Sequence, residues 1–241
     1  MSEPRALSSA LPPARRRAAR TALAALLSGP LLAAGADTAS AGAWPRAQGT
    51  SFLSMSYQLQ LNDTTDLDYT SIFYEYGLTD TWTIGFDGGH NPVTDDSSPV
   101  IFLRHPIFPN SGPNLFAAEI GLGAVEIGGE LEAVIRPGFS WGRGYQAGFG
   151  SGWMGVESSY AFRGDGSQVA KLDATLGYNH AGGSLSFVQV QTYYPVGDEL
   201  SVAVQPTYVQ KVSERLFVEM GANYKLTNGA MSVKLGIWTT F

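Results

Sequence analysis

The chain has 241 residues, of which 15 are basic and 21 acidic, and it contains no cysteine. Its formal net charge of −6 argues against nucleic acid as a partner, because binding nucleic acid requires a basic face that displaces phosphate counterions. The lack of cysteine means that the fold does not depend on disulfides, which is compatible with an exported protein.

The first 41 residues differ from the rest and indicate a targeting signal. The cluster Arg15, Arg16, Arg17 and Arg20 precedes an apolar run over residues 21–34, and the tripeptide Ala-Ser-Ala at 39–41 matches the pattern that signal peptidase cleaves. A membrane-anchoring helix is the alternative, but a Gly-Pro pair interrupts a run already shorter than the roughly 20 residues that a spanning helix needs. We therefore predict a signal peptide over residues 1–41 and a mature chain over 42–241. Removing the leader leaves 10 basic and 19 acidic residues, a formal charge of −9.

Beyond Gly42 the dominant pattern is an alternation of apolar and polar residues with a period of two. Between Leu53 and Leu61 every second residue is apolar and the intervening residues are Ser or Gln, and the stretch from Met231 to Phe241 alternates in a similar way. Such alternation indicates β-strands with two different faces. No stretch has the roughly 18 consecutive apolar residues of a membrane helix or the 3.6-residue periodicity of a helical bundle.

The alternating stretches are about ten residues long, which suits a tilted strand that crosses a bilayer better than the strands usual in soluble sheets. Since every backbone group must be paired in hydrocarbon, such a sheet has to close on itself. We predict an all-β fold, a transmembrane antiparallel up-and-down β-barrel of about 12 strands. A count of ten to fourteen strands stays open because the edges of 106–113 and 141–149 are ambiguous, and a soluble β-sandwich is the alternative architecture. The expected strands lie near 50–61, 68–78, 81–90, 99–105, 114–125, 131–141, 149–162, 168–178, 184–194, 199–209, 215–226 and 230–241.

The last eight residues, KLGIWTTF, resemble the C-terminal strand signal of bacterial outer-membrane β-barrel proteins, with aromatic Phe241 last and apolar residues at alternate positions before it. In that class the signal is recognised by the barrel-assembly machinery, so the resemblance implies an outer-membrane location and that machinery as a partner. The segment YEYGLTDTWTIGF, residues 74–86, also resembles a strand-turn-strand unit of outer-membrane transporters linked to aromatic-compound degradation.

In such a barrel, the alternation assigns each side chain to the lipid or to the lumen. Aromatic residues near strand ends should form the girdles of a membrane barrel on the outer face. They are Tyr57, Tyr74, Tyr76, Trp82, Trp153, Tyr160, Tyr178, Tyr194, Tyr208, Tyr224 and Phe241. The candidate lumen-lining residues carry charges of both signs and are Glu75, Asp87, Arg104, Glu119, Arg136, Glu157, Lys171, Asp173, Glu219 and Lys234, accompanied by Gln58, Gln60, Gln189, Gln191, Gln205 and Asn223.

This lining has two interpretations. Charges on neighbouring strands could pair and fill the barrel, or they could border a small aqueous channel. A barrel of about twelve strands lies between a side-chain-filled barrel and an open porin. We predict a small passive channel or transport-related pore for small polar solutes, with a non-conducting structural or lipid-contacting barrel as the alternative. Its expected partners are outer-membrane lipids and the barrel-assembly machinery, while the oligomeric state stays open.

A lipid-modifying enzyme is the third hypothesis. His180 and Ser184 are the nearest candidates for a hydrolytic pair, because a serine nucleophile needs an imidazole within hydrogen-bond reach. Barrel lipases and deacylases place this pair two residues apart on one strand face, whereas here a glycine turn separates residues four apart. His90 and His105 have no nearby cysteine or repeated histidine spacing, so neither a metal nor another cofactor is expected. We predict no enzymatic activity.

Overall fold

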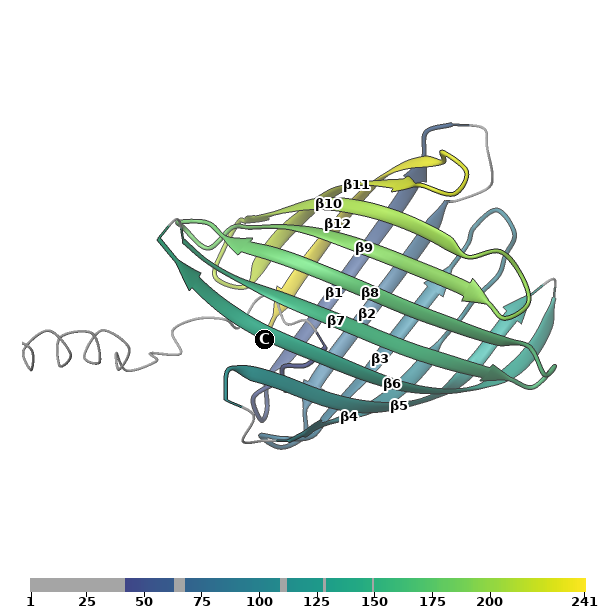
Figure 1. Ribbon diagram of the computed structural model, residues 1–241, viewed down its shortest axis with the longest axis horizontal. Helices are drawn as coiled ribbons and strands as arrows, with labels where there is room; N and C mark the ends of the chain where they lie inside the picture. The colour runs from purple at the N-terminus through teal and green to yellow at the C-terminus, as the bar shows by residue number, and fades with distance from the viewer. Residues whose placement is uncertain (1–41, 63–67, 109–111, 128, 149) are drawn as a thin grey trace, which may run out of the picture. The chain divides into compact units, whose positions relative to one another are not determined.

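The computed structural model describes residues 42–62, 68–108, 112–127, 129–148 and 150–241, and the predicted leader lies outside these residues. Across the described residues, twelve antiparallel strands form one closed barrel, so the predicted fold class is confirmed (Figure 1). No helix in this part of the chain is long and apolar enough to cross a membrane. The strands are β1 (Ser51–Gln60), β2 (Tyr69–Gly77), β3 (Thr83–His90), β4 (Val100–Ile107), β5 (Asn114–Ile127), β6 (Glu130–Ala147), β7 (Gly150–Arg163), β8 (Gln168–Asn179), β9 (Leu185–Pro195), β10 (Ser201–Lys211), β11 (Leu216–Lys225) and β12 (Met231–Thr240).

The seam between the first and last strands removes the free edges of the sheet. The register of β1 and β12 places Phe52 opposite Thr240. One residue beyond, the Ser51 N–H donates to the Phe241 carbonyl at 2.6 Å and the Phe241 N–H donates back at 3.1 Å. Because closure pairs the backbone groups that an edge strand would expose, the barrel can lie in hydrocarbon with its ladder satisfied.

The outer face of the barrel is apolar. Residues directly opposite each other on neighbouring strands share a face, so the register separates outward from inward side chains. Leu235 and Leu122 point outward and are 61% and 60% exposed. Large exposed apolar side chains on this scale need lipid or another apolar cover. Others of the set are Met55, Leu59, Ile101, Ile120, Ile135, Phe162, Leu172, Leu176, Val188, Val190, Met220 and Ile237.

Trp153 does not belong to the predicted aromatic girdle and points into the barrel instead. It is 7% exposed, and its ring lies 6.2 Å from that of Phe187, centroid to centroid. Gly177 lies directly opposite on β8 and makes the space, since a Cβ there would lie 2.3 Å from the indole ring. The prediction was wrong because it relied on residue type. The phase of the alternation already placed residue 153 on the same face as Glu157.

Strand β6 is longer than predicted, since it continues past residue 141 to Ala147. Glycines interrupt the sequence signal there, but the alternation persists. Gly142 lies on the inner face, and a Cβ at this position would lie 2.3 Å from the Trp44 ring. The missing side chain leaves room inside the barrel for residues that precede β1.

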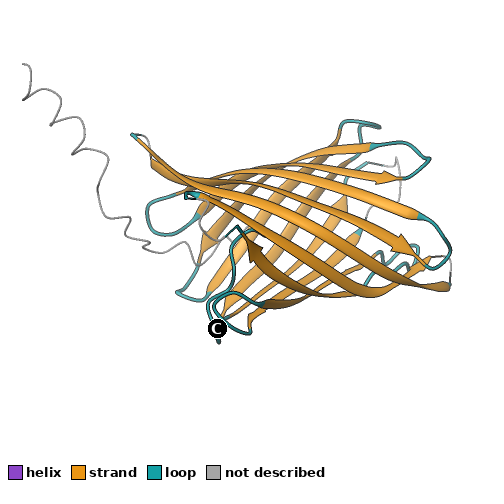
Figure 2. Cartoon of the chain, turned by 60° about the horizontal axis from the view of Figure 1, so that its bottom comes forward, coloured by secondary structure: helices purple, strands orange, loops and turns teal. Residues whose placement is uncertain are grey.

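The two ends of the interior differ. We call the end where β1 begins and β12 finishes the closed end, and the opposite one the open end; Figure 2 shows connections at both. At the closed end the rings of Phe187 and Trp238 stack at 6.1 Å, although β9 and β12 are not neighbours. Side chains therefore reach across the interior and fill it. The buried cluster consists of Phe52, Trp153, Leu185, Val209, Phe217 and Trp238.

Candidate functional site

The register places the ten candidate residues on the inner face, in distinct groups. Five of them, Glu75, Asp87, Arg104, Glu119 and Arg136, lie in one salt-bridge network. Glu219 and Lys234 form a separate pair, while Lys171, Asp173 and Glu157 line cavities beside these groups.

The network runs around the inner wall from β2 to β6. The guanidinium of Arg104 contacts Glu75 and lies 2.8 Å from Glu119 Oε2. Arg136 joins Glu119, at 3.4 Å, to Asp87, at 2.6 Å. Glu75 and Arg104 are only 1% and 6% exposed. Charges so well removed from water are tolerated because each has an opposite charge in hydrogen-bond contact.

The separate pair of Glu219 and Lys234 lies beside Trp238, one of the aromatic residues at the closed end. Lys234 Nζ lies 2.8 Å from Glu219 Oε1, and the Trp238 indole N–H donates to Glu219 Oε2 at 3.0 Å. Gly236 permits this arrangement, because a Cβ there would lie 2.9 Å from the same Glu219 oxygen. The ion pair and the indole thus complete the filling of the interior.

Toward the open end the inner space widens into cavities that we call the vestibule. Two of them have volumes of about 610 and about 460 Å³, and both are lined by Tyr69, Asn91, Lys171 and Tyr193. A third, of about 300 Å³, is also lined by Tyr69 and Lys171 and extends to Gly42. These shared residues join the cavities into one space that descends from the open end.

Uncharged polar groups line one wall of the vestibule. The Asn223 amide donates to Gln191 Oε1 at 3.0 Å and to Gln205 Oε1 at 3.3 Å. Lys171 Nζ lies 5.6 Å from the centroid of the Tyr193 ring. Amides, a lysine and tyrosine faces offer hydrogen bonds and an apolar face together, a combination that suits polar solutes with a carbon skeleton.

Asp68 contributes a negative charge at the mouth of the vestibule, just before β2. Its carboxylate accepts hydrogen bonds from the Gln60 N–H at 3.0 Å and from the Tyr57 hydroxyl at 2.8 Å. The backbone hydrogen bond from Gln60, followed by that from Tyr57, holds the pKa of Asp68 below its usual range. The group is therefore charged at neutral pH.

Residues 42–47, which we call the inner segment, run into the barrel at the closed end, with Gly42, Ala43 and Arg46 buried and Ala47 exposed. Ala43 is fully buried and Arg46 is 7% exposed. Arg46 Nε lies 2.6 Å from Glu75 Oε2, and its backbone N–H donates to Thr83 Oγ1 at 3.1 Å. The sequence interpretation missed Arg46, because this segment precedes the first strand and has no alternation.

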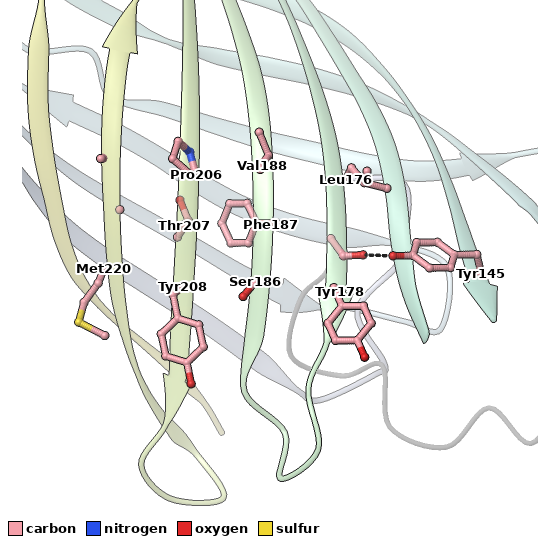
Figure 3. Close-up of a pocket in the computed structure, with 13 residues that line it drawn as sticks. Tyr145, Leu176, Tyr178, Ser186, Phe187, Val188, Pro206, Thr207, Tyr208 and Met220 are labelled. Carbon is pink, nitrogen blue, oxygen red and sulfur yellow. Dashed lines mark hydrogen bonds between the residues drawn. The ribbon is translucent and has the colours of Figure 1, made fainter. Parts of the chain in front are cut away.

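An apolar groove of about 600 Å³ lies across β8 to β11 near the closed end (Figure 3). Its lining includes outward-facing Leu176, Val188 and Met220. The hydroxyl of Tyr145 donates to the Gly177 carbonyl at 2.8 Å at one side of it, as the dashed line shows. A groove of this composition on the lipid-facing side is suited to acyl chains.

The candidate hydrolytic pair of His180 and Ser184 does not form. Ser184 Oγ instead accepts hydrogen bonds from the Gln210 amide at 3.1 Å and the Lys211 N–H at 3.2 Å. His180 Nε2 lies 2.7 Å from Ser186 Oγ, and no carboxylate of the described residues lies within hydrogen-bond or salt-bridge distance of His180. A histidine and serine without an orienting group are an incomplete hydrolytic site. Among the residues that the structure describes, no cluster of His, Asp or Glu could hold a metal ion.

Taken together, a closed antiparallel sheet, an apolar outer face and a polar interior define the fold as that of an integral membrane β-barrel. The chain resembles bacterial outer-membrane β-barrel proteins of known structure. It matches no protein family by sequence, and no curated protein is significantly similar to it.

Three solved structures illustrate the likeness. A KdgM porin in complex with disordered oligogalacturonate has a TM-score of 0.59 at 8% identity, with 79% of this chain and 99% of that chain covered. A NanC porin has a TM-score of 0.57 at 10% identity, covering 78% and 98%. The COG4313 outer membrane channel from Pseudomonas putida F1 has a TM-score of 0.52 at 12% identity, covering 86% and 98%. At these identities the likeness concerns the fold alone.

Proposed function

We propose that the chain is an outer-membrane channel for small polar solutes, with residues 42–241 forming its membrane-inserted barrel after removal of a leader at 1–41. The observation that carries this proposal is the vestibule, a polar space inside a closed sheet whose outer face is apolar. A purely structural barrel of this size has no need of a water-accessible interior lined by amides and charges. Outer-membrane lipids cover the apolar outer face, and the barrel-assembly machinery recognises the C-terminal strand that ends at Phe241.

The lining favours small neutral or zwitterionic solutes over strongly acidic ones. The two larger cavities are lined by five basic and five acidic residues, so the charges balance. The structurally similar KdgM porin was solved with an acidic saccharide, oligogalacturonate, which supports a sugar-sized solute for the present barrel but not acid selectivity. Cavities of about 460 and about 610 Å³ lie within the range of roughly 300–1,000 Å³ usual for small-molecule sites.

The filled closed end favours a second candidate, a non-conducting barrel. There the aromatic cluster, the Glu219–Lys234 pair and the inner segment occupy the interior. In a channel, part of this filling has to move or leave a narrow passage. A non-conducting barrel would keep it fixed.

Liposome swelling separates the two candidates. The purified mature barrel is reconstituted and transferred into isotonic solutions of a monosaccharide, a zwitterionic amino acid or a large dextran. We expect swelling in the first two solutions and none in dextran, against protein-free liposomes. If neither the wild type nor a variant lacking residues 43–48 exceeds the protein-free rate in any solution, the channel proposal is wrong and the non-conducting barrel replaces it.

A further inference from the structure

The inner segment is fitted to the wall of the barrel over its whole length. At one end, a Cβ at Gly142 would lie 3.0 Å from the Ala43 Cβ, and at the other a Cβ at Gly77 would lie 2.1 Å from the Ala47 carbonyl oxygen. In the middle, Arg46 lies 4.5 Å from the centroid of the Phe52 ring. Two wall glycines thus make room for a specific backbone path. The segment is a built component of the closed end.

The backbone nitrogen of Gly42, the first residue of this segment, contacts a carboxylate. The Gly42 nitrogen donates a hydrogen bond to Glu157 Oε1 at 2.7 Å. A side chain at residue 42 would be tight, because a Cβ there would lie 3.2 Å from Glu157 Cδ and 3.5 Å from Arg104 Cζ. Glycine therefore permits the nitrogen to approach the carboxylate closely.

Around this contact, the carboxylates outnumber the basic side chains. Arg46, Arg104 and Arg136 are each in salt bridges with Glu75, Asp87 or Glu119. Two more carboxylates, Glu157 and Asp173, lie directly opposite each other on β7 and β8, and they line the same cavity as one further cation, Lys171. No described Lys, Arg or His nitrogen lies within 4.0 Å of Glu157. A carboxylate on the inner wall is most stable with a cation in direct hydrogen-bond contact.

We propose that Glu157 is a binding site for the chain's own α-ammonium group, and that this ion pair locks the inner segment across the closed end. Hydrolysis of the Ala41–Gly42 peptide bond consumes one water, leaving a carboxylate on Ala41 and an amino group on Gly42 that is protonated at neutral pH. The nitrogen already in contact with Glu157 then becomes the missing cation. Leader removal thus converts a neutral hydrogen bond into a charged latch.

The latch rests on the leader removal proposed above, and its effect on solute passage rests in addition on the proposed channel function. The inner segment borders the cavity of about 300 Å³ that connects to the vestibule, since Gly42 lines it. A locked segment narrows the route to the closed end, and a released segment widens it.

Thiol labelling tests the latch directly. The chain has no cysteine, so Ala43→Cys places a single thiol at a fully buried position of the segment. Intact mass first verifies that the mature chain begins at Gly42. In detergent micelles, a water-soluble maleimide should label the folded variant at least about tenfold more slowly than the urea-unfolded one.

The matched comparison uses Glu157→Gln and Glu132→Gln, each in the Ala43→Cys background. Glu157→Gln keeps the hydrogen bond and removes the charge, so labelling should accelerate by at least about tenfold. Glu132→Gln makes the same chemical change on the neighbouring strand β6 and should leave the rate unchanged. Equal rates in the two variants, an N-terminus other than Gly42, or a thiol in the parent that reacts at the unfolded rate would each overturn the proposal.

Two further readouts keep the test decisive. Folding of Glu157→Gln is checked on a detergent gel, where a folded barrel migrates differently before and after boiling. If this variant does not fold, the α-amine of the wild type is probed with an N-terminus-selective acylating reagent. Protection in the folded barrel supports the latch, and reaction at the unfolded rate refutes it. Conductance is recorded in parallel. If labelling follows the expectation but no variant conducts, the channel proposal alone is wrong. If the barrel conducts but Glu157→Gln and Glu132→Gln are labelled at the same rate, the latch proposal alone is wrong.

Discussion

The closed end and the vestibule are built from the same alternating strands, but their charged side chains differ in burial and in partners. At the closed end Glu75 and Glu219 are each 1% exposed and bonded to cations. In the vestibule, Lys171 lines all three inner cavities and its ammonium group lies over the Tyr193 ring. Strand number and tilt do not set this difference, because both regions share them. The inner segment and the aromatic cluster set it by excluding water from one end.

The comparison predicts that substitutions at the closed end change stability, whereas those in the vestibule change permeation. A buried charge that loses its partner leaves an uncompensated charge behind, while a charge facing water loses little when it is altered. The expected effects below decrease from the first variant to the last.

Glu75→Ala should have the largest effect. It leaves the guanidiniums of Arg46 and Arg104 without their shared carboxylate in a region shielded from water, at a cost of roughly 3–5 kcal/mol. Urea unfolding in micelles, followed by loss of the fast-migrating gel form, measures the change. Glu130→Ala, at the exposed start of β6, is the control. A similar small loss in both variants would contradict the network's importance.

Gly142→Ala should come next, with Gly144→Ala as its matched control on the same strand and face. A Cβ at residue 142 would lie 2.3 Å from the Trp44 ring, whereas at 144 the nearest atom is 3.9 Å away. The first substitution should cost about 1–3 kcal/mol through overpacking or expel the inner segment. Unfolding and Trp44 quenching by acrylamide, against a Trp44→Phe reference, distinguish these outcomes. Indistinguishable variants would show that the segment does not pack there.

Lys171→Glu should alter selectivity and leave stability nearly unchanged. It converts a charge that lines the vestibule from positive to negative, shifting an even lining of five and five to four and six. The reversal potential in a salt gradient should move toward cation permeation, most strongly at low ionic strength. Arg215→Glu, in the exposed turn between β10 and β11, should leave it in place. No shift in the Lys171 variant would exclude the vestibule from the ion path.

His180→Ala should have the smallest effect. Since His180 contacts Ser186 without an orienting carboxylate among the described residues, we expect phospholipid hydrolysis by the wild type to equal the protein-free background. The variant should match it. Release of fatty acid that disappears in His180→Ala would instead identify the outer groove as a lipid-hydrolysing site.

The barrel could be predicted well from the sequence, because the alternation that indicates each strand lies within about ten consecutive residues. Strands β1 and β12 alternate with a period of two over most of their length, and their pairing closes the sheet as expected. The prediction failed for Trp153, where an aromatic residue inside the barrel depends on Gly177 of another strand. It also ended β6 too early, since glycines that serve the packing of Trp44 look like a turn in a single sequence.

The charged interior was harder to predict. Alternation assigns a face, but it gives neither the register that sets Arg104 directly opposite Glu119 nor the reach of the Arg104 guanidinium past β3 to Glu75 on β2. Arg46 had no periodic context at all. The division of the interior into a filled and an open end follows from that segment, so the sequence alone left the two lumen interpretations balanced.

Single-channel conductance in a planar bilayer is the most direct test of the central claim, that a polar vestibule inside a membrane barrel is closed at one end by residues 42–47. The wild type is compared with a variant in which Gly42 is joined to Gly49 by deletion of residues 43–48. We predict small, infrequent openings for the wild type and a larger, steadier conductance for the deletion variant. Equal conductance in the two, or silence in both when each migrates as a folded barrel, would contradict the account.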